Sequence, residues 1–91
     1  MSPEAIQDIK ALKAHDRVQI KDLMETHLRN EPMKTSKSRI KRLRGLSRPQ
    51  FRLRAGEFRV YYDVVGSMVQ ILAIIKKSKS DEWLKRAGEK T

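Results

Sequence analysis

The sequence contains no cysteine, few aromatic side chains and no long apolar run. Without cysteine the chain has no disulfide, no thiolate metal site and no thiol nucleophile, which fits a reducing cytoplasm. No apolar stretch approaches the roughly 18 residues of a membrane-spanning helix. The start, MSPEAIQDIK, lacks the basic head and apolar core of a signal peptide. We therefore expect a cytoplasmic protein without a membrane partner.

Acidic residues are also scarce. Eleven of them stand against 21 lysines and arginines, giving a net charge of +10 over 91 residues, a length that predicts one domain, residues 1–91. The excess is concentrated between residues 34 and 59, where Glu57 is the one acid. Such a block indicates a polyanionic partner, nucleic acid first, or an acidic protein. Its ten basic residues are Lys34, Lys37, Arg39, Lys41, Arg42, Arg44, Arg48, Arg52, Arg54 and Arg59.

The N-terminal third of the chain has the pattern of two amphipathic helices. Ser2 is a typical N-cap, Pro3 suits the first helical position, and Glu4 places an acid in the first turn. Asp16 is placed to cap a second helix, which we expect to end before Pro32. The apolar face of that helix is predicted to comprise Val18, Ile20, Leu23, Met24 and Leu28.

Strand patterns follow a polar and basic segment, residues 31–42, which is predicted to be a loop. Apolar residues alternate with polar ones over 51–55 and 58–64, with a short turn between them. Residues 68–75 are almost continuously apolar, which predicts a central strand covered on both faces. Residues 81–87 suit a short helix. The predicted fold is α+β: an N-terminal helical hairpin packed on a small antiparallel β-sheet, with a short C-terminal helix.

Strand periodicity places three arginines on one face of this sheet. If the apolar residues face the helices, then Arg52, Arg54 and Arg59 share the opposite face. Like charges on neighbouring strands, about 5 Å apart, repel unless an anion lies between them. The arginines therefore indicate a phosphate-binding site. The alternative is that they only keep this face of the sheet soluble and prevent edge-to-edge pairing. Tyr61 falls on the same face, where it either stacks on a base or packs.

Three runs resemble the RelE branch of the RelE/ParE toxin superfamily: LRGL (43–46), FRLRAGEFRVYYDV (51–64) and VQILAIIKKSKSDEWL (69–84). The resemblance covers essentially the whole chain and implies a RelE-like fold, here without the usual first strand. It implies a type II toxin that enters the ribosome and cuts mRNA in the A site by attack of the RNA's 2′-hydroxyl, without metal or cofactor. The implied partners are a cognate antitoxin with an acidic segment, the ribosome and mRNA; operator DNA would be bound only through the antitoxin complex.

The resemblance also implies roles for individual residues. Arg52, Arg54 and Arg59 correspond to basic residues at the scissile phosphate, and Lys77 to an arginine near the leaving group. Trp83 corresponds to a base-stacking tyrosine, but its indole has no hydroxyl to move a proton. The candidate substrate contacts are Arg44, Tyr61, Lys76 and Trp83. The residues expected to follow the ribosomal RNA backbone are Lys34, Lys37, Arg39, Lys41 and Arg42.

Cleavage needs a neutralised phosphate and a protonated leaving oxygen. Arginine clamps a phosphate but stays protonated, so it is no general base. Lys77 or Lys76 is the better proton donor, because crowding by arginines would lower the pKa of an ammonium group.

Two other functions stay open. One is inhibition of DNA gyrase by protein contact without RNase activity, as on the ParE side of the superfamily. The other is a non-catalytic module that binds RNA or the ribosome. The three arginines and the loop at Lys77 favour the RNase over the gyrase inhibitor.

Overall fold

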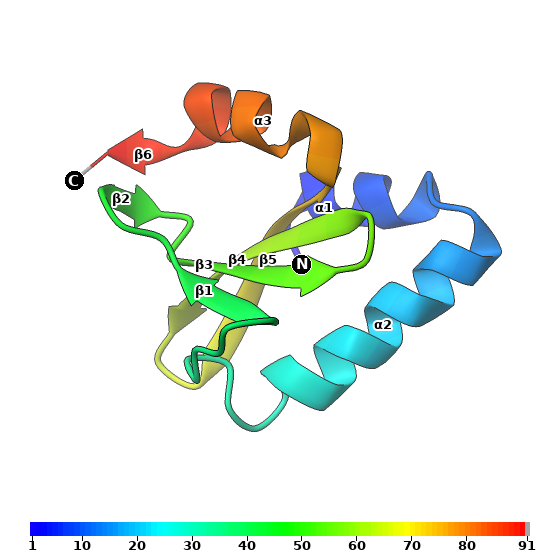
Figure 1. Cartoon of the computed structure of the whole chain (residues 1–91), viewed down its shortest axis with the longest axis horizontal. Helices are drawn as coiled ribbons and strands as arrows, with labels where there is room; N and C mark the ends of the chain where they lie inside the picture. The colour runs from blue at the N-terminus through cyan, green and yellow to red at the C-terminus, as the bar shows by residue number, and fades with distance from the viewer. Residues whose placement is uncertain (91) are drawn as a thin grey trace.

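The computed structural model describes residues 1–90 and places two helices before the strands and one near the C-terminus (Figure 1). Its elements are α1 (Pro3–Lys10), α2 (Ala14–Leu28), β1 (Ile40–Arg42), β2 (Leu46–Arg48), β3 (Phe51–Ala55), β4 (Phe58–Val65), β5 (Met68–Lys76), the 3₁₀ turn η1 (Lys77–Lys79), α3 (Ser80–Ala87) and β6 (Glu89–Lys90). The helical hairpin, the antiparallel sheet and the C-terminal helix are as predicted.

The main sheet is antiparallel, with strand order β1-β3-β4-β5, and β2 pairs with β6 in a second, two-stranded sheet. Two predictions about the strands are wrong. The segment expected to be a loop contains β1, because Ile40 pairs with Leu53 and is buried. The apolar strand β5 lies at an edge of the sheet and not at its centre. Its apolar run has another cause, because Ile71 and Ile74 pack in the main core while Ala73 packs against Trp83 of α3.

Local signals explain where the two N-terminal helices begin. The Ser2 hydroxyl accepts a hydrogen bond from the Ala5 N–H at 3.1 Å, which confirms Ser2 as the N-cap of α1. The second helix starts at Ala14, before Asp16, and its N-cap Lys13 makes no side-chain capping bond. Asp16 is therefore not the cap. It lies in the first turn, where its negative charge interacts favourably with the positive end of the helix dipole.

The sheet separates two groups of buried side chains. On one face, Ile20 and Leu28 of α2 pack with apolar residues of the strands; Val18 was expected among them but is 60% exposed. On the other face α3 covers Tyr61 and Ala73. Figure 1 shows α2 and α3 on opposite sides of the sheet. No helix in the described part of the chain is long and apolar enough to cross a membrane.

Three hydrogen bonds attach the start of the chain to β5. The Ser2 N–H donates to the Ile71 carbonyl at 2.9 Å, and the Ser2 hydroxyl donates to the Leu72 carbonyl at 2.9 Å. The Ile74 N–H donates to Asp8 Oδ2 at 2.8 Å. These contacts fix α1 along the edge strand β5. The arginines and α3 lie on the face of the sheet opposite α2.

Candidate functional site

The strand register confirms the shared face of the arginines. Arg54 lies directly opposite Arg59 across β3 and β4, and Arg52 lies opposite Tyr61. On the other side of β3, Lys41 of β1 lies opposite Arg52. Facing positions in an antiparallel pair project to the same side of the sheet. Four cationic side chains and one tyrosine therefore start from one face.

A basic pocket opens beside this face, between β1 and β3. It is a cavity of about 220 Å³ whose walls include Lys37, Arg39, Lys41, Arg52 and Arg54. Two groups of residues with separate predicted roles therefore meet here: the arginines assigned to the scissile phosphate and part of the set assigned to the RNA backbone. The complete lining is Ser36, Lys37, Ser38, Arg39, Ile40, Lys41, Arg52 and Arg54.

A serine-centred turn holds the outer wall of the basic pocket. The Ser36 hydroxyl accepts hydrogen bonds from the N–H groups of Arg39 and Ile40, at 3.0 and 3.3 Å. The Arg39 side chain donates to the carbonyl of Arg54 at 3.3 Å, which ties the loop to β3. Ser36 was not predicted as a site residue from the sequence. The available signal was a serine three residues before the N–H it caps, a pattern typical of such turns.

The remaining basic residues assigned to RNA lie around the pocket or away from it. Arg42 and Arg44 line a larger neighbouring hollow of about 660 Å³. Arg42 points to the helix side of the sheet, because its strand partner is Phe51 and its guanidinium lies 5.3 Å from the Phe51 ring centroid. Lys34 is paired with Glu31 at 3.5 Å in an exposed contact.

The arginines of this face have no acidic partner within residues 1–90. The ion pairs of the described chain join Arg29 to Glu25, Lys34 to Glu31, and Arg48 to both Asp63 and Glu89. The buried Nε of Arg52 also lacks a hydrogen-bond partner. Adjacent cations without counter-ions repel one another, so an anion in the basic pocket would be stabilised.

Arg59 differs from its neighbours because it is 5% exposed. Its Nη1 donates to the carbonyls of Gly56 and Phe58, both at 2.9 Å. Burial lowers the pKa of Arg59, and the positive charges of Arg54 and Arg52 lower it further. An arginine still keeps its proton under such conditions. Arg59 therefore adds a fixed charge beneath the surface, while Arg54 is exposed.

The two candidate proton donors belong to different elements, Lys76 to the end of β5 and Lys77 to η1. Lys76 is the strand partner of Phe58, whose side chain belongs to the main core, so its position faces the helices. Lys77 starts η1 beyond the strand, and its N–H donates to the Glu57 carbonyl at 2.7 Å. Both lysines therefore lie beside the β3–β4 turn, but only the backbone of Lys77 is bonded to the Glu57 carbonyl within it.

The aromatic candidates Tyr61 and Trp83 pack against each other. Their ring centroids lie 4.8 Å apart, and both side chains are buried. The Trp83 Nε1 donates to Glu4 Oε1 at 3.2 Å, which links α3 to α1. Burial raises the pKa of Tyr61. Contact of either ring with a base stays a prediction, and here each ring is covered by the other.

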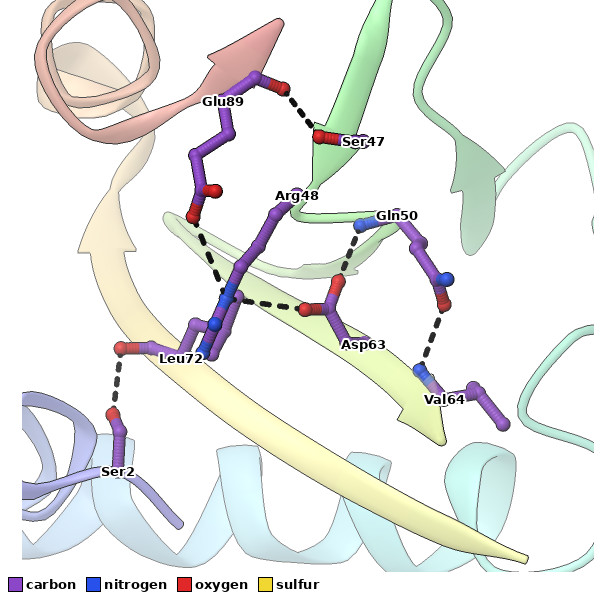
Figure 2. Close-up of polar contacts among 8 residues, drawn as sticks. All are labelled: Ser2, Ser47, Arg48, Gln50, Asp63, Val64, Leu72 and Glu89. Carbon is purple, nitrogen blue, oxygen red and sulfur yellow. Dashed lines mark hydrogen bonds and ion pairs between the residues drawn. The ribbon is translucent and has the colours of Figure 1, made fainter. Parts of the chain in front are cut away.

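Arg48 belongs to the central basic block but, unlike the arginines of the sheet face, has acidic partners. Figure 2 shows it between Asp63 and Glu89, with Nε–oxygen distances of 3.3 and 4.0 Å. Asp63 also accepts the Gln50 N–H at 2.7 Å, and the Gln50 side chain accepts the Val64 N–H at 2.9 Å. This network connects β2 and β4 with the C-terminal strand. Arg48 thus attaches the C-terminal segment to the rest of the fold. It is distinct from the arginines of the sheet face, which have no acidic partner in the described residues.

Comparison with known proteins agrees with this architecture. The crystal structure of a RelB–RelE antitoxin–toxin complex from Methanococcus jannaschii matches with a TM-score of 0.69 and 21% sequence identity, covering 90% of this chain and 94% of that one. At this identity the likeness shows the fold, which is RelE-like. No curated protein matches the sequence.

The family comparison is more specific. A family model described as "ParE toxin of type II toxin-antitoxin system, parDE" matches residues 1–80, which include α1, α2, all four strands of the main sheet and η1. The superfamily expected from the sequence is confirmed. The chain belongs to the ParE toxin family of type II toxin–antitoxin systems.

Proposed function

We propose that this protein is a ribosome-dependent endoribonuclease that cleaves mRNA in the A site and is neutralised by a cognate antitoxin. The observation that carries the proposal is the basic pocket, where Arg52 and Arg54 meet Lys37, Arg39 and Lys41 without a carboxylate. A phosphodiester supplies the negative charge that this arrangement lacks, and preorganised cations stabilise the additional charge that develops on phosphorus oxygens during attack.

The chemistry proceeds by positioning and charge neutralisation. The RNA 2′-oxygen forms a bond to phosphorus, the bond from phosphorus to the 5′-oxygen breaks, and a 2′,3′-cyclic phosphate results. Arg52 and Arg54 bind the phosphate oxygens. Lys77 gives a proton to the leaving 5′-oxygen, and the proton of the 2′-hydroxyl passes to solvent. No metal takes part in this scheme.

An antitoxin is the proposed protein partner. The matched toxin structure is that of a RelB–RelE complex, and the net charge of +10 favours an acidic segment in the partner. Such a segment would compete with RNA for the exposed cations around Arg54. Co-expression with the antitoxin should therefore relieve the growth arrest that the toxin causes alone.

Cell-free translation with primer extension tests the RNase proposal. The wild-type chain should cut mRNA at codon-located positions on ribosomes, and Arg54→Ala should reduce the rate about 10²–10³-fold, as for loss of one preorganised donor to a developing oxyanion. Arg86→Ala removes one exposed charge from α3 and serves as the matched control. Intact mRNA in the presence of well-folded wild-type protein would contradict the proposal.

Gyrase inhibition is the second candidate, favoured by the ParE description of the matching family. It requires protein contact and no proton transfer. A supercoiling assay run beside the translation assay separates the two functions: arrested supercoiling with intact mRNA indicates the gyrase inhibitor. If neither activity is seen while RNA binding persists, the chain is a non-catalytic RNA-binding module.

A further inference from the structure

At the turn between β3 and β4, three successive backbone carbonyls accept hydrogen bonds from two different donors, a side chain and a backbone N–H. The carbonyls of Gly56 and Phe58 both accept from Arg59 Nη1 at 2.9 Å. The carbonyl between them, that of Glu57, accepts from the N–H of Lys77 at 2.7 Å. Gly56 has a φ of +59°, so the turn is tight. Arg59 and the start of η1 therefore grip the same short segment.

The contacts of Arg59 contrast with those of its neighbour across the strands. Arg54 lies opposite Arg59 but is exposed, and it lines the basic pocket. Arg59 is 5% exposed, its Nη1 is engaged by two carbonyls, and it does not line the basic pocket. A guanidinium that clamps a phosphate presents two parallel N–H groups to it. The exposed guanidinium of Arg54 can bind a phosphate in this way. In Arg59, by contrast, Nη1 already donates to two backbone carbonyls.

We propose that Arg59 is a positioning residue: it closes the β3–β4 turn from within and so fixes the start of η1, with Lys77, beside the arginine face. The function of Lys77 as proton donor rests on the proposed RNase activity, but the clamp itself does not. Phosphate binding then belongs to Arg52 and Arg54, and Arg59 acts on the reaction through the place it gives to Lys77.

Electrostatics explain why arginine suits this position. The Arg59 charge is repelled by Arg54 and Arg52, and the negative ends of two carbonyl dipoles offset that repulsion. A planar guanidinium with several fixed donors reaches both carbonyls at once, whereas a lysine ammonium is a compact point charge on a flexible stem. Lysine at position 59 would therefore keep the charge but lose much of the geometry.

Amide hydrogen exchange measured by NMR tests the clamp without any assay of activity. In Arg59→Ala and in Arg59→Lys, the Lys77 N–H should exchange about tenfold faster than in the wild type, because the turn that holds it opens more often. In Arg54→Ala and in the control Arg86→Ala it should stay within about twofold. Unchanged Lys77 exchange in both Arg59 variants would overturn the proposal. Should Arg59→Ala fail to fold, Arg59→Lys alone decides, since it retains the charge.

RNA binding tests the division of roles between the two facing arginines. The probe is a twelve-nucleotide oligouridine with 2′-O-methyl groups, which is not cleaved, titrated at several salt concentrations. Arg54→Ala should reduce the slope of log affinity against log salt by about one unit, as expected for loss of one phosphate contact. Arg59→Lys should leave the slope unchanged within error. Equal loss of slope in Arg59→Lys and Arg54→Ala would identify Arg59 as a phosphate ligand and overturn the proposal.

Kinetics on programmed ribosomes distinguish this inference from the function on which it rests. With an active wild type, Arg59→Lys should lower kcat and leave KM within about twofold, while Arg54→Ala should lower kcat and also raise KM because a phosphate contact is lost. A raised KM with unchanged kcat in Arg59→Lys would contradict the inference. If the wild type neither cuts mRNA nor binds RNA, the RNase proposal fails, and Lys77 exchange alone then confirms or refutes the clamp.

Discussion

At the scale of single residues, Asp8 has two opposite effects on stability: its carboxylate accepts a hydrogen bond that supports the fold, and burial of its charge is unfavourable. Its Oδ2 accepts the Ile74 N–H of the edge strand at 2.8 Å. Burial nevertheless raises the pKa of Asp8 above its ordinary value of 3.8, with Glu4 adding to the rise and the Ile74 N–H opposing it. A raised folded-state pKa means that this group stabilises the fold below the unfolded value and that this contribution is lost as pH rises through the folded pKa.

We therefore expect Asp8→Asn and Asp8→Ala to behave differently. The amide keeps an oxygen for the Ile74 N–H and cannot ionise, so Asp8→Asn should be at least as stable as the wild type at pH 7. Alanine leaves that N–H without an acceptor and should cost about 1–3 kcal/mol. Urea unfolding at pH 4 and pH 7 measures both effects. A large loss in Asp8→Asn at pH 7 would mean that the charge itself is required.

Trp83 provides a second test at this scale. The indole is 4% exposed, stacks on Tyr61 and donates to Glu4, so it acts as the anchor of α3. Trp83→Ala should destabilise the fold by about 3–5 kcal/mol, as for other buried aromatic residues. Glu4→Gln keeps an acceptor for the indole N–H and should cost less than about 1 kcal/mol. Denaturant unfolding followed by circular dichroism measures both variants, and a mild Trp83→Ala would indicate that α3 is held by other contacts.

At the scale of elements, the small sheet of β2 and β6 depends on Arg48. Arg48→Met removes its contacts with both carboxylates and leaves Asp63, which is 8% exposed, with the Gln50 N–H. The expected loss is about 1–3 kcal/mol, because a buried carboxylate is left without its cation. Glu89→Gln should cost less than about 0.5 kcal/mol, since that pair is long and exposed. Urea unfolding that ranks Glu89→Gln as the more harmful change would refute this assignment.

The elements also show what could be predicted from sequence. Alternation over residues 51–64 was sufficient for β3, β4 and their arginine face, because side chains on a strand alternate with a period of two. The strands β1, β2 and β6 are each too short to show alternation, and they form only where tertiary contacts provide a partner. The edge position of β5 was missed because burial by helices on both faces produces the same apolar run as a central position.

In the candidate site, the sequence likewise predicted which residues share a face but not their tertiary contacts. Periodicity placed Arg52, Arg54 and Arg59 on one face, and the register confirms it. Burial of Arg59 and its bonds to two carbonyls depend on how its side chain packs against the Gly56 turn, which strand periodicity does not reveal. Likewise, contact of Trp83 with Glu4 joins positions 79 residues apart and follows from tertiary packing alone.

At the scale of the whole molecule, the uncompensated charge makes stability dependent on anions. A ligand that binds only the folded state stabilises it by mass action, so pyrophosphate should raise the Tm of the wild type by several degrees. Arg54→Ala should remove most of this rise, while Arg86→Ala should retain it. Sodium chloride at matched ionic strength is the control for general screening, and an equal rise with that salt would argue against a specific anion site. Differential scanning calorimetry provides the measurement.

The attachment of α1 to the edge strand has a consequence for how the protein is made. Ser2 bonds to a carbonyl 70 residues further along the chain, and Glu4 bonds to Trp83 beyond it. These contacts of α1 can therefore form only after β5 and α3 have left the ribosome. Contacts this distant in sequence close late and slowly. The attachment of α1 to β5 and α3 is therefore expected among the last steps of folding.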